Sequence, residues 1–125
     1  MLTYNYEVEV KKDLENYIDE NYDFDSDFDG MDIEDIYDKI YEDVWVADSV
    51  TGNASGSYTF CRYQAEENLL HNMDLVYKAC VQDFGYDASD IGKLYIEEQF
   101  ETIDVMVRCY FVGTILWDVL NERLV

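Results

Sequence analysis

Three aspartates occupy every second position in an acidic segment that ends at a glycine. Asp25, Asp27 and Asp29 alternate with other residues, and Gly30 follows them directly. Carboxylate oxygens at alternate positions, with a glycine for the sharp turn, are the hard ligands that Ca²⁺ takes in a loop. These three aspartates are therefore the candidate ligands of a divalent-cation site.

This segment resembles the first half of an EF-hand calcium loop over six residues only. Counted from Asp25, the twelfth position is Ile36, where that family has a bidentate glutamate. Alternate acids also arise by chance in a chain this rich in aspartate, and a solvated acidic turn that caps the next helix is the simpler explanation. We predict weak calcium binding at best, and a cation-binding module stays as an alternative function.

A second acidic pattern falls on one face of an expected helix. Asp35, Asp38 and Glu42 are three and four residues apart, a spacing that places them in one row on a helix. Like charges at this spacing destabilise a helix, and choices that cost stability without helping folding are typical of functional positions. Asp13 and Glu20 are expected on the outer face of the preceding helix in the same way.

These acids form a candidate surface for binding another protein. Duplex nucleic acid presents about one negative charge per 1.7 Å of axis, and a row of carboxylates can imitate it. Tyr37 and Tyr41 lie among the acids and could supply the aromatic anchors that are common at protein interfaces. We predict a partner with a basic surface, such as a nucleic-acid-binding protein. A merely solvated acidic face without a partner explains the row equally well.

The residue types of an active site do not occur in a recognisable arrangement. His71 is the only histidine and is expected within a helix, and Cys61 has no evident partner base. The glycine- and serine-containing segment 48–57 lacks the lysine of a phosphate-binding loop, and a structured turn is the better interpretation. We predict a non-enzymatic protein without a cofactor.

Composition limits both the partners and the compartment. Twenty-nine acidic residues against eight basic ones give the 125-residue chain a net charge of −21, of which −14 falls in residues 1–50. Direct binding to nucleic acid or to an anionic membrane is therefore not expected. Three cysteines without C-x-x-C spacing, together with an N-terminus unlike a signal peptide, indicate a cytoplasmic protein. The sequence does not indicate an oligomeric state.

The spacing of apolar residues predicts helices throughout a single domain, 1–125. The expected helices cover residues 7–21, 32–46, 62–84, a short stretch within 87–101, and 102–124. Asp29 or Asp32 should cap the second, Gly85 should end the third, and Ser89 or Asp90 should begin the fourth. The last helix is apolar nearly all round, which predicts a central position.

The predicted fold is thus all-α, a compact bundle of four or five helices with a structured Gly/Ser loop before the third. Within that loop, positive backbone φ angles are expected at Gly52 and Gly56. Apolar residues on both sides of the loop leave one alternative open. Residues 44–46 and 58–60 could pair as a small β-hairpin.

Residues 48–60, of sequence DSVTGNASGSYTF, and the AEEN run at 65–68 carry a family resemblance. The chain resembles a family of short acidic proteins carried on plasmids, conjugative elements and phages of Gram-positive bacteria. The resemblance implies no catalytic or binding residues. It implies a setting in which acidic proteins inhibit host restriction or CRISPR defence.

The combined expectation is an acidic interaction protein of a mobile element. Its finer form is a nucleic-acid mimic that inhibits a host defence or DNA-binding protein. A calcium-binding module and a structural accessory protein without a small-molecule site are the alternatives.

Overall fold

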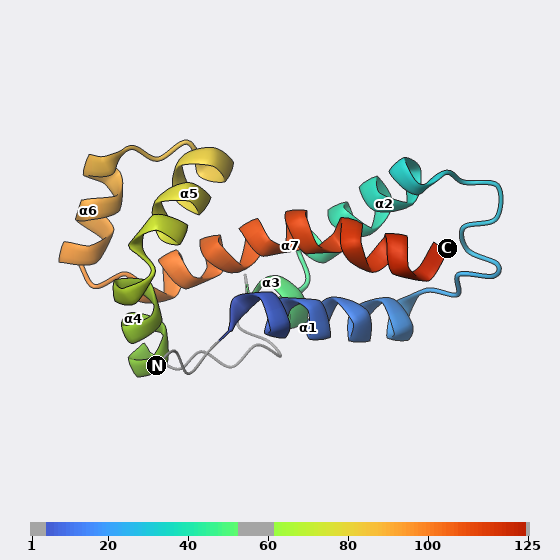
Figure 1. Cartoon of the computed structure of the whole chain (residues 1–125), viewed down its shortest axis with the longest axis horizontal. Helices are drawn as coiled ribbons and strands as arrows, with labels where there is room; N and C mark the ends of the chain where they lie inside the picture. The colour runs from blue at the N-terminus through green and yellow to red at the C-terminus, as the bar shows by residue number, and fades with distance from the viewer. Residues whose placement is uncertain (1–4, 53–61, 125) are drawn as a thin grey trace.

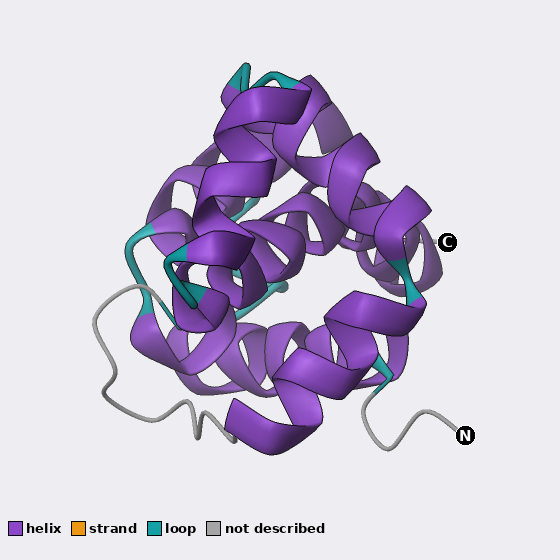
Figure 2. Ribbon diagram, turned by 90° about the vertical axis from the view of Figure 1, so that its left-hand side faces the viewer, coloured by secondary structure: helices purple, strands orange, loops and turns teal. Residues whose placement is uncertain are grey.

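The computed structural model describes residues 5–52 and 62–124, which form helices joined by short connections. The helices are α1 (Tyr6–Asn21), α2 (Ile33–Trp45), α3 (Asp48–Thr51), α4 (Arg62–His71), α5 (Met73–Phe84), α6 (Ala88–Ile96) and α7 (Phe100–Leu124). No strand occurs in these residues, and the all-α prediction is confirmed (Figure 2). None of the described helices combines the length and the apolar composition that spanning a bilayer requires.

Helix α7 is the axis of the described structure. It runs along the length of the molecule and contacts each of the other six described helices (Figure 1). Helices α1 and α2 lie beside its C-terminal half, whereas α4, α5 and α6 gather around its N-terminal half. A helix that is apolar on most of its faces needs partners on all of them, which explains the central position that the sequence predicts.

The buried side chains form two clusters, one on each half of α7. The first joins α1, α2 and α3 to the C-terminal half, and its largest buried side chains include Leu14, Ile18, Ile40, Leu116 and Leu120. The second joins Tyr6 and helices α4 to α6 to the N-terminal half, and it includes Leu69, Val76, Cys80, Ile103 and Val107. A single 25-residue helix therefore carries both cores.

Side-chain caps set where three of the helices begin. Asn5 caps α1, and Asp32 caps α2 by accepting a hydrogen bond of 2.9 Å from the backbone N–H of Asp35. The prediction for α6 is wrong, because neither Ser89 nor Asp90 is its cap. Asp87 accepts from the Asp90 N–H at 2.8 Å while the Asp90 carboxylate accepts from the Asp87 N–H at 3.1 Å, which is a reciprocal capping box.

The expected third helix, 62–84, is two helices. Asn72 lies between α4 and α5 with non-helical angles, φ −126° and ψ 46°. Its side-chain Nδ2 donates to the carbonyl oxygen of Asn68 at 2.8 Å, the acceptor that the residue-72 N–H would use in a continuous helix. Asparagine competes in this way with the helix backbone, and the break lets α4 and α5 pack at different angles on α7. Gly85 ends α5 with φ 68°, as predicted.

The segment after α2 differs from both expectations for it. Val44 and Trp45 belong to α2 and form no strand. The predicted hairpin between residues 44–46 and 58–60 is therefore wrong for its first strand, and residues 58–60 lie outside the described part. Residues 48–51 form the short helix α3, closed by the Thr51 hydroxyl, which donates to the carbonyl of Ala47 at 2.8 Å. Gly52 has φ 75°, in the left-handed region that favours glycine. Residues 53–61, with Gly56 and Cys61, lie outside the described part.

Candidate functional site

Helix α2 presents its acidic row to solvent. Its opposite face is buried in the first core cluster through Ile36, Ile40 and Val44. Asp35, Asp38 and Glu42 are all exposed. None of the three carboxylates makes a hydrogen bond or an ion pair with any other residue within 5–52 and 62–124. The row is therefore a charged surface without a cationic partner in the described structure.

The two tyrosines beside the row pack against α7 rather than standing free. The Tyr37 ring stacks on Trp117 at a centroid distance of 4.5 Å, and Tyr41 stacks on Tyr37 at 5.5 Å. The Tyr37 hydroxyl donates to the carbonyl of Gly113 at 2.9 Å. Partial burial raises the pKa of Tyr37 to about 12. Both rings are half-buried, and Tyr41 also stacks on Trp45 at a centroid distance of 5.6 Å.

Asp13 is not on the outer face of α1, and this part of the predicted surface is wrong. Its carboxylate forms an ion pair with the guanidinium of Arg108, a fully buried side chain of α7. The Nε of Arg108 also donates to the carbonyl oxygen of Val50 in α3. A buried cation needs a counter-ion and hydrogen-bond acceptors, and Asp13 supplies the former. Glu20, by contrast, is exposed as expected.

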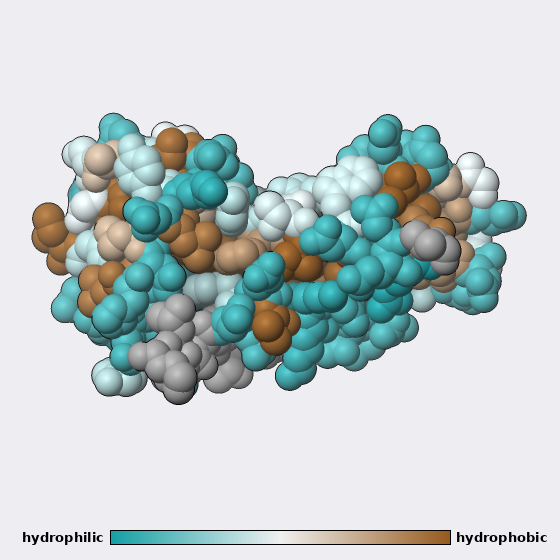
Figure 3. All heavy atoms as spheres, viewed as in Figure 1, coloured by the Kyte–Doolittle hydropathy of each residue, from teal (hydrophilic) through white to brown (hydrophobic). Residues whose placement is uncertain are grey.

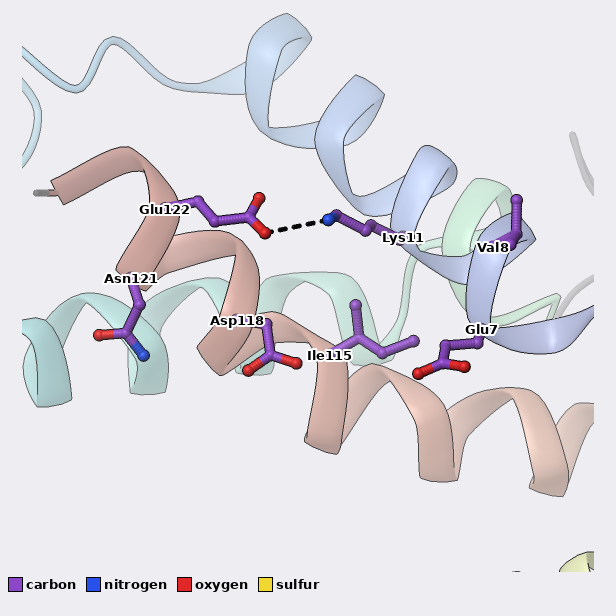
Figure 4. Close-up of a pocket in the computed structure, with 7 residues that line it drawn as sticks. All are labelled: Glu7, Val8, Lys11, Ile115, Asp118, Asn121 and Glu122. Carbon is purple, nitrogen blue, oxygen red and sulfur yellow. Dashed lines mark hydrogen bonds and ion pairs between the residues drawn. The ribbon is translucent and has the colours of Figure 1, made fainter.

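A groove between α1 and α7 is also charged, but part of its charge is neutralised internally. Figure 4 shows Glu7, Lys11, Asp118 and Glu122 along it, with Ile115 between them. The Lys11 ammonium lies 3.0 Å from a carboxylate oxygen of Glu122, and this hydrogen bond and charge raise the pKa of Lys11. A cationic ligand would therefore compete with Lys11 for this groove.

A buried carboxyl in the second core cluster is the other ionisable group that the sequence did not single out. The Tyr6 hydroxyl donates to one oxygen of Asp104. Burial raises the pKa of Asp104 to about 6, against the lowering effect of this hydrogen bond. The contact ties the start of α1 to α7. We therefore assign this carboxyl a structural role.

The acidic turn between α1 and α2 does not gather its carboxylates. One Asp27 oxygen accepts from the backbone N–H of Asp23 at 2.7 Å, which closes the turn. Phe28 points into the core and is almost fully buried, while Asp25 and Asp29 are exposed. Within the described residues, no group of three or more acidic, histidine or cysteine side chains is arranged to hold a metal ion. The structure therefore does not support Asp25, Asp27 and Asp29 as joint ligands.

The histidine and the two cysteines of the described residues differ in exposure. His71 is exposed at the end of α4. Cys80 and Cys109 are buried, and burial raises the pKa of their thiols to about 11 and about 12. Thiols with such pKa values stay protonated at neutral pH and are poor nucleophiles. Both cysteines fill core space, as their apolar surroundings in the sequence suggest.

Comparison of the chain with protein-family models, curated proteins and solved structures gives no match. The class that the structure itself defines is an all-α protein whose exposed acids on α2 lack cationic partners among the described residues. The resemblance to acidic proteins of mobile elements stays a prediction. Residues 53–60 of the segment that carries it lie outside the described part of the chain.

Proposed function

We propose that the protein is a non-enzymatic interaction protein that binds a basic surface of another protein through α2. The observation that supports this is the row of Asp35, Asp38 and Glu42. The three carboxylates are exposed and form no ion pair with any described residue. Asp13 of α1 does not extend this surface, because its carboxylate pairs with Arg108 inside the molecule. A row of carboxylates that forms no ion pair with the described residues favours a cationic partner outside them.

The finer proposal is a mimic of nucleic acid, directed at a nucleic-acid-binding protein of a host. With a helical rise of about 1.5 Å per residue, the row carries roughly one negative charge per 5 Å. Each strand of duplex DNA carries about one per 3.4 Å. The two densities are close enough for a site built for phosphates to accept the row. The net charge of −21 adds a long-range attraction for the same basic site.

The alternatives have less support. A calcium-binding module would need the carboxylates of Asp25, Asp27 and Asp29 to converge, and those of the described turn do not. A structural accessory protein does not need exposed acids without ion-pair partners. In such a protein the acidic row would serve solubility alone. The binding experiment below separates this last alternative from the proposal.

The test replaces the row without changing side-chain shape. A partner is first recovered by pull-down with the parent protein. We expect Asp35→Asn, Asp38→Asn and Glu42→Gln together to weaken binding to this partner by at least about tenfold at 0.1 M salt, mainly through slower association. Purified partner and variant are compared by surface plasmon resonance at several salt concentrations. The matched control neutralises three exposed acids elsewhere, Asp74→Asn, Glu101→Gln and Asp118→Asn, with the same change in net charge.

Competition with duplex DNA decides the finer proposal. A mimic and DNA should exclude each other from the partner, and the partner should carry a basic nucleic-acid site. Equal losses in the row variant and in the control variant would show that net charge alone drives binding. Full retention of binding by the row variant would leave solubility as the role of the acids.

A further inference from the structure

A groove separates α2 from α5, and α7 forms its floor. Figure 3 shows a concave region of the molecular surface between the end that holds α4 to α6 and the end that holds α2. The groove encloses about 440 Å³. Its walls include Tyr37, Tyr41 and Trp45 from α2 and Asp83 from α5, and Gly113 and Thr114 lie on the floor. It is distinct from the outward-facing acidic row, although both are on α2.

Stacked aromatic rings make one wall of the groove. Tyr37 and Tyr41 lie nearly parallel, with an interplanar angle of 17°, because they are one helical turn apart on α2. Contact with Trp117 and the hydrogen bond to Gly113 hold Tyr37 in place. The face of an aromatic ring carries partial negative charge and attracts a cation within about 6 Å. The stack continues to Trp45, which lies 5.6 Å from Tyr41, so each tyrosine presents to the groove only the part of its ring that the neighbouring rings leave uncovered.

An uncompensated carboxylate stands on the opposite wall. Asp83 makes no hydrogen bond or ion pair with any residue of 5–52 or 62–124. Partial desolvation raises the pKa of Asp83. Burial is also the main reason why the pKa values of Tyr37 and Tyr41 are raised, and the Asp83 charge across the groove adds to that effect. None of the described residues that line the groove is basic. The groove thus combines aromatic faces with a negative charge that has no counter-ion.

We propose that this groove accepts an arginine side chain from a basic segment of the partner protein. The inference rests on the proposed function and names the chemistry of the partner at one point of contact. A planar guanidinium can stack on the tyrosine faces while its N–H groups donate to the Asp83 carboxylate, and it is more easily desolvated than an ammonium. Charge complementarity therefore favours arginine over lysine or an apolar side chain here.

The test uses the whole protein and a defined probe. A short capped peptide with one central arginine is titrated into ¹⁵N-labelled protein, and the amide shifts of Gly113 and Thr114 report occupancy of the floor. The comparison peptide has citrulline at the same position, which keeps the shape of arginine without its charge. We expect the arginine peptide to bind at least about tenfold more tightly, since the charge-assisted contact is lost with citrulline.

Two variants locate the contact. Asp83→Asn should weaken binding of the arginine peptide about tenfold, whereas Asp74→Asn, the same change on the exposed start of α5, should change it less than about twofold. Tyr41→Phe keeps the ring face and should bind like the parent. Tyr41→Leu should bind about threefold more weakly because the cation–π contact is lost. Circular dichroism melts verify that each variant is folded.

The outcomes separate this inference from the proposed function. Equal binding of the citrulline and arginine peptides, equal effects of Asp83→Asn and Asp74→Asn, or no shift at Gly113 would each overturn the groove as an arginine site. In those cases, loss of partner binding in the variant of Asp35, Asp38 and Glu42 would still support the acidic row. The converse result is an arginine peptide found in the groove while the variant of Asp35, Asp38 and Glu42 still binds the partner like the parent. That result would support the groove as a binding site and contradict the acidic row.

Discussion

Asp13 and Arg108 show how the fold reassigns an acidic residue at the scale of single side chains. The sequence places Asp13 among many similar carboxylates, but the structure pairs it with a fully buried guanidinium. Arg108 in turn connects α7 to the backbone of α3. This pair joins three helices of the first core cluster, so we attribute Asp13 to stability and not to partner binding.

Removing the counter-ion should therefore destabilise the protein. Asp13→Asn leaves the Arg108 charge buried without compensation, and we expect the free energy of unfolding to fall by roughly 3 kcal/mol. Glu20→Gln on the same helix removes an exposed charge and should change it by less than about 0.5 kcal/mol. Urea denaturation followed by circular dichroism measures both. Equal, small losses would contradict the buried ion pair.

At the scale of the elements, short-range side-chain chemistry decides where helices begin and end. Asn72 interrupts an apolar pattern that would otherwise support one helix over 62–84, and a capping box moves the start of α6 to Ala88. Gly85 and Gly92 give a direct comparison of backbone requirements. A Cβ added at either would meet no atom within 4 Å, but only Gly85 has a positive φ.

The two glycines should respond in opposite directions to alanine. Gly85→Ala forces a Cβ into the left-handed conformation and should cost about 1 kcal/mol of stability. Gly92→Ala lies within α6, where it should add roughly 0.5 to 1 kcal/mol by lowering the entropy of the unfolded chain. Thermal melts of the two variants provide the measurement. A stabilising Gly85→Ala would mean that α5 does not end in this conformation.

At the scale of the whole molecule, one long helix carries two cores under a strongly negative surface. Ion pairs such as Arg123 with Asp19 offset only a small part of the charge. Eight basic residues cannot neutralise twenty-nine acidic ones, so mutual repulsion opposes folding. The same excess charge that should attract a basic partner is thus a cost to the free protein.

Salt should therefore act oppositely on folding and on binding. Raising NaCl from 0.01 M to 0.3 M shortens the Debye length from about 30 Å to about 6 Å and screens the repulsion. We expect the free energy of unfolding to rise by about 1 kcal/mol, which raises Tm by roughly 5 °C. Association with a basic partner should become slower over the same range. Differential scanning calorimetry at constant pH tests the first effect. A Tm that falls over this range would show that attractive ion pairs outweigh the repulsion.

The sequence was enough to predict the helical class, the extent of α1, α2 and α7, and the exposure of the row at Asp35, Asp38 and Glu42. These features follow from the spacing of apolar and acidic residues along single helices, which is local information. It also indicated the central place of α7, since a helix apolar on most faces needs neighbours on all sides.

The partners of individual charges, by contrast, depend on how the helices pack together. Asp13 pairs with Arg108 across 95 positions of sequence, and Tyr6 meets Asp104 across 98, so no local spacing rule could connect them. The lone arginine in the apolar run of α7 was the one available signal of a buried ion pair. The groove between α2 and α5 likewise depends on how both helices pack on α7, because packing places residues distant in sequence on one surface.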